Sequence, residues 1–535
     1  MTRLISVVLL SCWFTLVHAA ELAPANPYLA DSSYPFPHGD TAQQDVVAAA
    51  GPLGRTRNLR PAEIDYVHLG PGAFGAYTSG PYPDGKRVLW TNTLDRIVKL
   101  DYDTHEMLAT WFTQGAPVWG ETQAWDAIDY FDANNEGFFA IVRAFREAQK
   151  LRSLAAVYTL VDRNNEYFVA NKAGYLEAYG DLQEGVRESA VVLRRRFDFP
   201  APLAGQDAIG LNMTPDGWIV TVTDVGKLLA VKRDFSEFRV GDLQHNSGAE
   251  AKATRPTGYG WVRNAAALDD SGGIYVVSQE YMHKVIWTGD GFSVDAADGA
   301  WAVPYDNSWG HGSGSTPSLM GFGDEEDKLV VITDGNPGMH VNAFWREAIP
   351  EDWAGLPGQP RRLAGAIKVR MGEQNLQTIQ SEQSVAVYGY GALVVNNGPR
   401  NVPWYLPEQA QTLLISFLGS SPQYQPFGVE KFEWNPVANR FERAWTNNTI
   451  SSPNCMPILS KGSDTAYLIG ARDNQWTLEA IDWATGESRF HYVIGGQRYN
   501  PLFSGTLLDS AGRIHYGTPW GRVRLNPRQA RTAGR

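Results

Sequence analysis

Cysteine is nearly absent from this sequence, and so are long hydrophobic runs beyond its N-terminus. The chain has 2 cysteines, Cys12 in the N-terminal stretch and Cys455 in the body. Once the stretch that holds Cys12 is removed, no disulfide can form within the chain, and we interpret Cys455 as a small buried hydrophobic residue rather than a nucleophile. No segment after Ala20 approaches the roughly 18 continuous apolar residues of a membrane-spanning helix. We therefore expect no membrane span.

A surplus of positive charge is also missing. Lys and Arg number 46 against 58 Asp and Glu, and the formal net charge is -12. An acidic surface disfavours nucleic acid as a partner. With 43% apolar, 12% aromatic and 19% charged residues, the composition is that of a globular protein with a large core, which excludes disorder for most of the length.

Residues 1–19 have the pattern of a signal peptide. Arg3 supplies a positive start, residues 4–16 are apolar, and Val17-His18-Ala19 is a small-residue cleavage site. We expect cleavage after Ala19 and a periplasmic or secreted protein. The alternative is a lipoprotein, because the residues before Cys12 loosely resemble a lipobox.

A repeated β-unit is the strongest signal in the chain. Each unit has an apolar run, a turn rich in Asp and Gly, a β-branched or aromatic run, a polar turn and a third run. Small residues that tolerate positive φ suit the hairpin turn. The clearest copies begin at Asn212, Asn264 and Pro501, with Asp216-Gly217, Ser271-Gly272-Gly273 and Ser510-Ala511-Gly512 at their turns.

Units of this length that hold three or four strands are typical of propeller blades. Eight second strands are anchored near Val88, Phe168, Ile219, Tyr275, Val330, Val394, Tyr467 and His515. We predict an all-β, eight-bladed β-propeller over residues 61–527, after an N-terminal extension (20–60) and before a tail (528–535). The last blade lacks an outer strand, and we predict that a segment around Ile64 to Leu69 supplies it and closes the ring.

Two insertions interrupt the repeat, near residues 113–150 and 399–426. In the first, Ile141, Ala144 and Phe145 have the spacing of an apolar helix face. The second is rich in Pro, Trp, Tyr and Gln. Long loops in compact domains are often lids or binding elements, and ornamental surface loops are the alternative.

These repeats resemble those of the eight-bladed quinoprotein-like β-propeller superfamily, whose units share a turn, a hydrophobic run, a glycine and a second hydrophobic run that ends in Asp. The cofactor-using members carry an adjacent cysteine pair at the quinone, and this sequence has no such pair. The resemblance therefore implies the fold and argues against quinone-dependent oxidation. The chain is also similar in style to lactonase and strictosidine-synthase-like propellers, whose sites place Glu, Asn and Asp around one divalent ion.

In a propeller, the loops that lead into the innermost strands open on the same face as the turns between second and third strands. We expect a small-molecule ligand at this channel mouth, although buried amides in a channel also serve to satisfy backbone groups. The expected substrate-binding residues are Asn212, Arg263, Asn264, Asn454, Arg472, Asn500 and Trp520.

His311 and Glu382 are the expected catalytic residues. His311 lies in the glycine-rich segment WGHGSGST, where glycine allows the backbone to approach a ligand and His can act as a base. Glu382 leads into another innermost strand. A carboxylate there needs a partner such as Arg263 or Arg472, and burial would favour its use as a general base. A structural Glu–Arg pair is the alternative.

Asp334, Asn336 and Asn396 are the expected ligands of a divalent cation such as calcium. Their oxygens suit a hard ion, but a full calcium site needs six to eight oxygens. An ordinary Asp-Gly-Asn turn explains the first two residues equally well.

Two functions stay open from the sequence. The first is an exported enzyme of the hydrolase, lactonase or lyase type, which acts on a small aromatic or sugar-like molecule at the channel mouth. The second is a non-catalytic scaffold for protein partners, whose expected feature is a patch on an outer rim.

Overall fold

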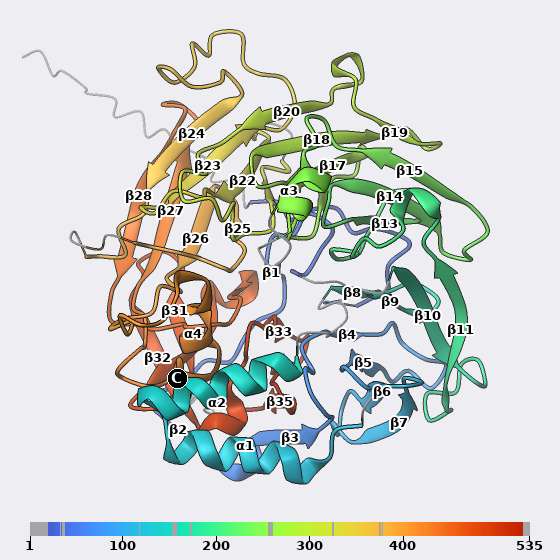
Figure 1. The fold of residues 1–535 in the computed structure, drawn as a ribbon, viewed down its shortest axis with the longest axis vertical. Helices are drawn as coiled ribbons and strands as arrows, with labels where there is room; N and C mark the ends of the chain where they lie inside the picture. The colour runs from blue at the N-terminus through green and yellow to red at the C-terminus, as the bar shows by residue number, and fades with distance from the viewer. Residues whose placement is uncertain are drawn as a thin grey trace, which may run out of the picture.

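The computed structural model describes residues 20–527 except 33, 35–37, 117, 152–157, 172–173, 255–259, 324–325, 374–375 and 377. The predicted signal peptide (1–19) and tail (528–535) lie outside the described residues. Strands dominate, and the described residues form eight sheets, most of them four-stranded and antiparallel. Figure 1 shows these sheets arranged around a common centre. Among the described residues, no helix is both long and apolar enough to cross a membrane.

Sheets 1 to 4 follow one another along the chain, each with its strands in sequence order. In sheet 4, β19 and β20 both pair with β18. The strands are β4 (Ala76–Thr78), β5 (Val88–Asn92), β6 (Arg96–Asp101) and β7 (Met107–Phe112) in sheet 1; β8 (Thr159–Val161), β9 (Tyr167–Asn171), β10 (Tyr175–Asp181) and β11 (Val191–Asp198) in sheet 2; β12 (Asn212–Met213), β13 (Trp218–Val222), β14 (Lys227–Lys232) and β15 (Phe238–Asp242) in sheet 3; β16 (Ala267–Leu268), β17 (Gly273–Val277), β18 (Tyr281–Trp287), β19 (Phe292–Ser293) and β20 (Trp301–Pro304) in sheet 4.

Sheets 5 to 8 repeat this order, and segments from the N-terminus join the last two. The strands are β21 (Ser318–Met320), β22 (Leu329–Thr333), β23 (His340–Trp345) and β24 (Leu363–Lys368) in sheet 5; β25 (Ala386–Tyr388), β26 (Gly391–Val395), β27 (Val429–Asn435) and β28 (Arg440–Asn447) in sheet 6; β29 (Ile458–Ser460), β30 (Thr465–Arg472), β31 (Gln475–Asp482) and β32 (Ser488–Gly495), with β1 (Val46–Val47) and β2 (Arg57–Asn58), in sheet 7; β33 (Leu507–Leu508), β34 (Ile514–Gly517) and β35 (Gly521–Leu525), with β3 (Ile64–His68), in sheet 8.

All eight expected second strands are present, because each holds its anchor residue. These strands are buried on both faces, as in β13 and β22, where every residue is buried, and their sequences are accordingly continuous apolar or β-branched runs. The outer strands alternate instead, as β11 does, because one face meets solvent. Gly217 and Gly512, in the expected hairpin turns, have φ of 89° and 75°, which explains why glycine is required there.

The chain's beginning pairs with its end. β3 lies antiparallel to β35 as the outer strand of sheet 8, with Asp65 opposite Arg524 and Val67 opposite Arg522. An ion pair of 2.6 Å between Arg524 Nη2 and Asp65 Oδ2 reinforces the pairing. This strand occupies the segment that the sequence analysis assigns to the missing outer strand.

Residues 20–60 also pair with the sheets, which the sequence analysis did not predict. The carbonyl oxygens of Thr41, Ala42, Gln44 and Asp45 accept backbone hydrogen bonds of 2.7 to 3.0 Å from the innermost strands of sheets 4, 5, 6 and 7 in turn. β1 and β2 add to the inner and outer edges of sheet 7, both as parallel strands. The extension is therefore part of the folded core.

The helices are insertions between strands. α1 (Glu121–Ala133) and α2 (Gly137–Lys150) lie between β7 and β8, α3 (Gly248–Thr254) between β15 and β16, and α4 (Thr412–Leu418) between β26 and β27. The helix expected around Ile141 is α2, and Ile141 and Ala144 are buried. Phe145 is 51% exposed, so the prediction that it lies on the buried face of the helix was wrong. Single 3-10 turns are η1 (Pro61–Glu63), η2 (Ala201–Leu203), η3 (Ala296–Asp298), η4 (Glu408–Ala410), η5 (Lys461–Ser463) and η6 (Gln497–Tyr499).

Deletion of residues 50–70 removes β2 and β3 and leaves the edges of β32 and β35 unpaired. We expect a large fall in melting temperature together with aggregation, because exposed strand edges pair with other chains. Thermal unfolding followed by circular dichroism, with light scattering, measures both. An unchanged melting temperature would show that β3 does not stabilise the sheets.

Candidate functional site

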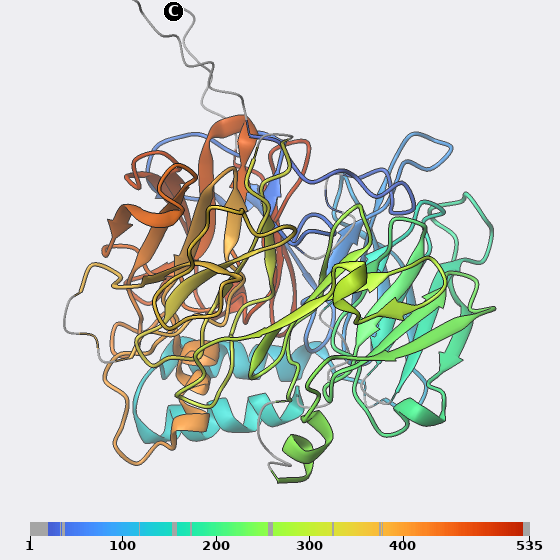
Figure 2. The same cartoon turned by 90° about the horizontal axis from the view of Figure 1, so that it is seen from above.

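The channel mouth is the face on which the loops into the innermost strands open. The four α-helices interrupt only these loops or a turn between second and third strands, so they belong to this face. Figure 2 shows α1 and α2 (cyan), α3 (green) and α4 (orange) on one side of the molecule. The expected site residues therefore lie on the helix-bearing face.

Glu382 and Arg263 form an ion pair across this face. Arg263 precedes β16 in sheet 4 and Glu382 precedes β25 in sheet 6, and their side chains are 13% and 15% exposed. Gln380 donates a second hydrogen bond to Glu382, and the Glu382 N–H donates to Asn397 Oδ1 at 2.7 Å. The expected Arg263 partner of Glu382 is thus present, and two other groups, Gln380 at the carboxylate and Asn397 at the backbone, help to fix the position of Glu382.

His311 lies beside this ion pair, between two glycines with positive φ, Gly310 and Gly312. Its ring stacks on Trp309 with the ring centroids 4.5 Å apart. Burial lowers the pKa of His311 below its ordinary value of 6.5; the charge of Arg263 lowers it too, and Glu408 and Glu382 oppose the shift. His311 is therefore neutral at pH 7 and able to accept a proton.

His311, Glu382, Asp334 and Asn336 line one pocket together with Trp309. The structure thus brings together both expected catalytic residues and two of the three expected metal ligands. The free space in the pocket is about 10 Å³, which is room for about one water molecule. A larger ligand requires the Trp309–His311 loop to move, and the two glycines beside His311 are suited to such a movement.

The metal site is not supported by this geometry. Both carboxylate oxygens of Asp334 are engaged by His340, through the ring Nδ1 at 2.9 Å and the backbone N–H at 2.8 Å. The side-chain oxygens of Asn336 and Asn396 accept hydrogen bonds from the Gly338 and Gly398 N–H groups at 2.8 and 2.9 Å. Within the described part of the chain, no group of three or more His, Cys, Asp and Glu side chains could hold a metal ion. We derive no chemical step through a metal.

The side chains of Asn212 and Asn264 bond to backbone groups and do not line an open pocket. Both are buried. The Asn212 amide donates to the carbonyl oxygens of Thr41 at 2.9 Å and Ala266 at 2.8 Å, so it fastens the N-terminal extension to sheet 4. The Asn264 amide donates to the Ser313 carbonyl oxygen at 3.1 Å. Their geometry fits the alternative in which buried amide side chains satisfy the hydrogen-bonding groups of the backbone.

Asn454 and Asn500 anchor α4. The Asn454 amide donates to the Ile415 carbonyl oxygen at 2.6 Å, and the Asn500 amide donates to the Ser416 carbonyl oxygen at 2.8 Å. Both acceptors are among the last four residues of α4, whose carbonyl groups have no partner within a helix. The two asparagines therefore hold this helix against the loops that lead into β29 and β33.

Trp520 and Arg472 also have structural partners. Trp520 is 6% exposed and packs in the apolar cluster that α1, α2 and α4 form. Arg472 makes a bidentate ion pair with buried Glu479, with both distances 2.8 Å. Of the seven expected substrate-binding residues, Arg263 is thus the one that joins the His311 and Glu382 cluster.

Sequence reasoning missed a polar cluster inside the channel. His38 Nδ1 lies 2.8 Å from Asp45 Oδ1 and 3.0 Å from Ser384 Oγ, and all three residues are buried. The first two belong to the N-terminal extension, which showed no repeat signal. Their polar pattern was visible, but nothing in the sequence placed them against sheet 6. Cys455 is buried, and burial raises its pKa to about 12, in keeping with an inert thiol.

The residues present do not fit a quinone as the cofactor-using propellers hold it, because the adjacent cysteine pair is missing from the sequence. A second small cavity, of about 10 Å³, is lined by Tyr34, His38, Tyr77 and Tyr158. We derive no step through a quinone.

Solved structures with a similar fold identify the architecture. The quinohemoprotein alcohol dehydrogenase ADHIIG of Pseudomonas putida HK5 has a TM-score of 0.50 at 10% sequence identity, over 96% of this chain and 82% of that one. The quinohemoprotein alcohol dehydrogenase of Comamonas testosteroni reaches 0.49 at 12% identity over the same shares. The first of these likenesses shows a β-propeller fold for this chain, the fold that its repeats predict.

A sequence relative shows the family to which this chain belongs. No model of a known protein family matches the chain. A protein of Archaeoglobus fulgidus, described as uncharacterized, is 32% identical over 519 residues, which are 95% of this chain and 89% of the relative. This chain belongs to the same family as that protein.

The pKa of His311 can be measured directly by NMR. We expect a value below 6.5, and a further fall in Glu382→Gln, because that change removes a charge that raises it. Since the folded state favours the neutral ring, His311 stabilises the fold above its ordinary pKa, and this contribution is lost as the pH falls. A pKa at or above 6.5 would contradict the half-buried position of the ring.

Asn500→Ala tests the anchoring of α4. Loss of the buried amide removes the 2.8 Å hydrogen bond to the Ser416 carbonyl oxygen, which keeps only the longer bond of 3.2 Å from the Asn454 amide. We expect the free energy of unfolding to fall by about 1–3 kcal/mol. Hydrogen exchange should speed up in α4 above all. Exposed Asn448→Ala is the control and should leave both unchanged. Equal exchange in α4 for the Asn500 variant and the wild type would show that Asn500 does not anchor the helix.

Proposed function

We propose that this protein is an exported, eight-bladed β-propeller that binds a small organic ligand at its channel mouth. The signal-peptide pattern of residues 1–19 supports export. Eight sheets around a common centre, with the first long strand paired to the last, support a closed ring of eight blades. In this ring, the loops of sheets 4, 5 and 6 converge at the mouth.

The main support for a ligand site is that Arg263, His311 and Glu382 lie close together. They precede the innermost strands of three consecutive sheets, so no local turn requires them to meet. The ion pair is largely removed from water, which costs free energy that a hydrophobic pair would not. Such an arrangement is typical of sites where charge is needed for function.

This cluster is suited to hydrolysis of an ester or lactone. Neutral His311 accepts a proton from a water molecule as the water oxygen bonds to the carbonyl carbon, and Arg263 stabilises the negative charge that forms on the carbonyl oxygen. The carbon–oxygen bond to the leaving group then breaks, and His311 returns the proton to the leaving alkoxide. Glu382 holds Arg263 in place.

The test uses 4-nitrophenyl acetate and δ-valerolactone as substrates. We expect turnover by the wild type and at least a 10-fold loss of kcat/KM in His311→Gln, as general acid–base groups contribute about 10² to 10⁴. Glu382→Gln should also lose at least 10-fold, because Arg263 loses the carboxylate that positions it against the developing oxyanion. Glu373→Gln, which breaks an ion pair with Arg400 on the surface, is the control and should retain activity. Unchanged turnover in both cluster variants would remove these residues from the site. If the wild type is inactive on both substrates, the proposal of ester or lactone hydrolysis is wrong.

A scaffold for protein partners is the second candidate, and an exposed aromatic patch favours it. Phe138 and Phe139 at the start of α2 are 57% and 78% exposed, and Trp404 is 95% exposed. The Phe138 and Tyr405 rings lie 5.9 Å apart, so the two insertions form one patch. Exposed apolar patches of this kind mark interaction surfaces.

A further inference from the structure

A polar groove lies on the face opposite the channel mouth. Its walls are the turns between first and second strands and between third and fourth strands of sheets 2 and 3, with one turn of sheet 1. These turns are at the other end of the strands from the loops that hold His311 and Glu382. The groove has a volume of about 830 Å³, which is within the usual range of ligand sites. Within the described residues, it is far larger than either channel cavity.

The floor of the groove is a pair of Arg–carboxylate contacts. Arg233 Nη1 lies 2.7 Å from Asp162 Oδ2, and Arg195 Nη1 lies 3.1 Å from Glu166 Oε1. Arg195 also donates to the Arg233 carbonyl oxygen at 3.2 Å, which ties sheet 2 to sheet 3. These side chains are held in place before any ligand arrives, so their remaining donor and acceptor positions are preorganised.

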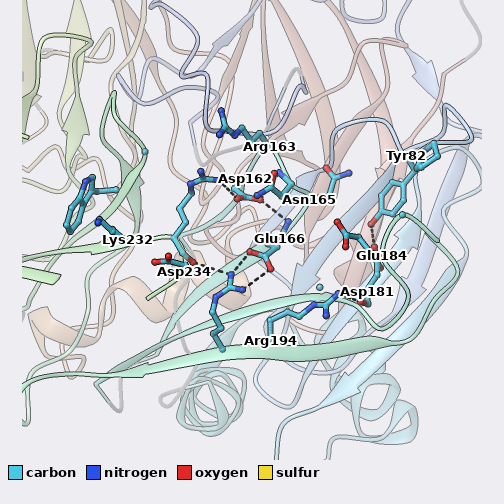
Figure 3. A pocket seen from close by; sticks show the side chains of 18 of the residues that line it. Tyr82, Asp162, Arg163, Asn165, Glu166, Asp181, Glu184, Arg194, Lys232 and Asp234 are labelled. Atoms are coloured by element: carbon cyan, nitrogen blue, oxygen red, sulfur yellow. Dashed lines mark hydrogen bonds and ion pairs between the residues drawn. The ribbon is translucent and has the colours of Figure 1, made fainter. Parts of the chain in front are cut away.

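One wall carries an ion-paired carboxylate, Asp181, and two charged side chains that have no partner of opposite charge among the described residues. Asp181 accepts hydrogen bonds from Tyr82 at 2.9 Å and from buried Lys99. Beside it, Arg194 and Glu184 are exposed, and among the described residues neither pairs with a group of opposite charge. Figure 3 shows Glu166, Asp181, Glu184 and Arg194 around one hollow.

The balance of charge indicates the kind of ligand. Six carboxylates and five Arg or Lys side chains line the groove. A polyanion would need a surplus of cations and a polycation a surplus of carboxylates, and neither is present. Carboxylate oxygens only accept hydrogen bonds and guanidinium groups only donate them, whereas a hydroxyl group does both. A neutral chain of many hydroxyl groups can therefore satisfy every lining group.

We propose that this groove binds a neutral oligosaccharide. Its volume accommodates several sugar rings, and affinity comes from hydrogen bonds to fixed carboxylate and guanidinium groups. Trp218 and Tyr82 line the groove but are 7% and 4% exposed, so stacking on their rings contributes little. The site is separate from the channel mouth and does not depend on the chemistry proposed there.

The test is calorimetric titration with cellohexaose, maltohexaose and xylohexaose. We expect at least one to bind the full-length protein, with an affinity that changes little between low and high salt because the ligand is uncharged. Asn164→Trp, which places an indole in the groove at an exposed position, should abolish binding. Arg194→Ala and Glu184→Ala should each weaken it about 10- to 150-fold, the range for hydrogen bonds to charged groups.

Arg196→Ala is the matched control. Arg196 lies on β11 as Arg194 does, is exposed, and pairs with Asp198 outside the groove, so its loss should leave binding unchanged. Melting temperatures verify that each variant is folded. The proposal is overturned if none of the three sugars binds at millimolar concentration, if Asn164→Trp retains full affinity, or if polygalacturonate binds more tightly than all three in a salt-sensitive manner.

Discussion

The pairing of the chain's first long strand with its last is the constraint on which the rest of the structure depends. Sheet 8 has only three strands of its own, and β3 supplies the fourth through a regular antiparallel register that the Asp65–Arg524 ion pair reinforces. The N-terminal extension adds to this pairing, because four of its carbonyl oxygens bond to four innermost strands in turn. The described residues hold no disulfide, so these hydrogen bonds help to join the N-terminal segments to the sheets.

This arrangement gives the two faces different properties. On the helix-bearing face, Asn454 and Asn500 hold α4. On the same face, His311 and Glu382 line a small pocket, and Arg263 pairs with Glu382. On the opposite face, the hairpin turns of sheets 2 and 3 stand apart and leave an open groove. The mouth thus requires a loop movement to admit a ligand, whereas the groove is accessible as it is.

The repeat pattern predicts the strands well because each buried second strand is a continuous apolar run, and the turns need glycine at fixed places. The pairing of Glu382 with Arg263 was also predictable, since a carboxylate at a channel needs a cation. The roles of several other residues could not be predicted from the sequence. The amides of Asn212 and Asn500 bond to backbone of distant segments, and the groove residues Asn164 and Glu184 lie in turns that look ordinary in sequence.

A disulfide trap across the β3–β35 pair tests the closure most directly. Asp65 and Arg524 are opposite residues in the register, so cysteines at both positions should be joined on mild oxidation. We predict a monomer with an internal disulfide whose melting temperature falls on reduction. Failure to form the bond, or its formation only between two molecules, would contradict a ring in which one chain's own ends meet.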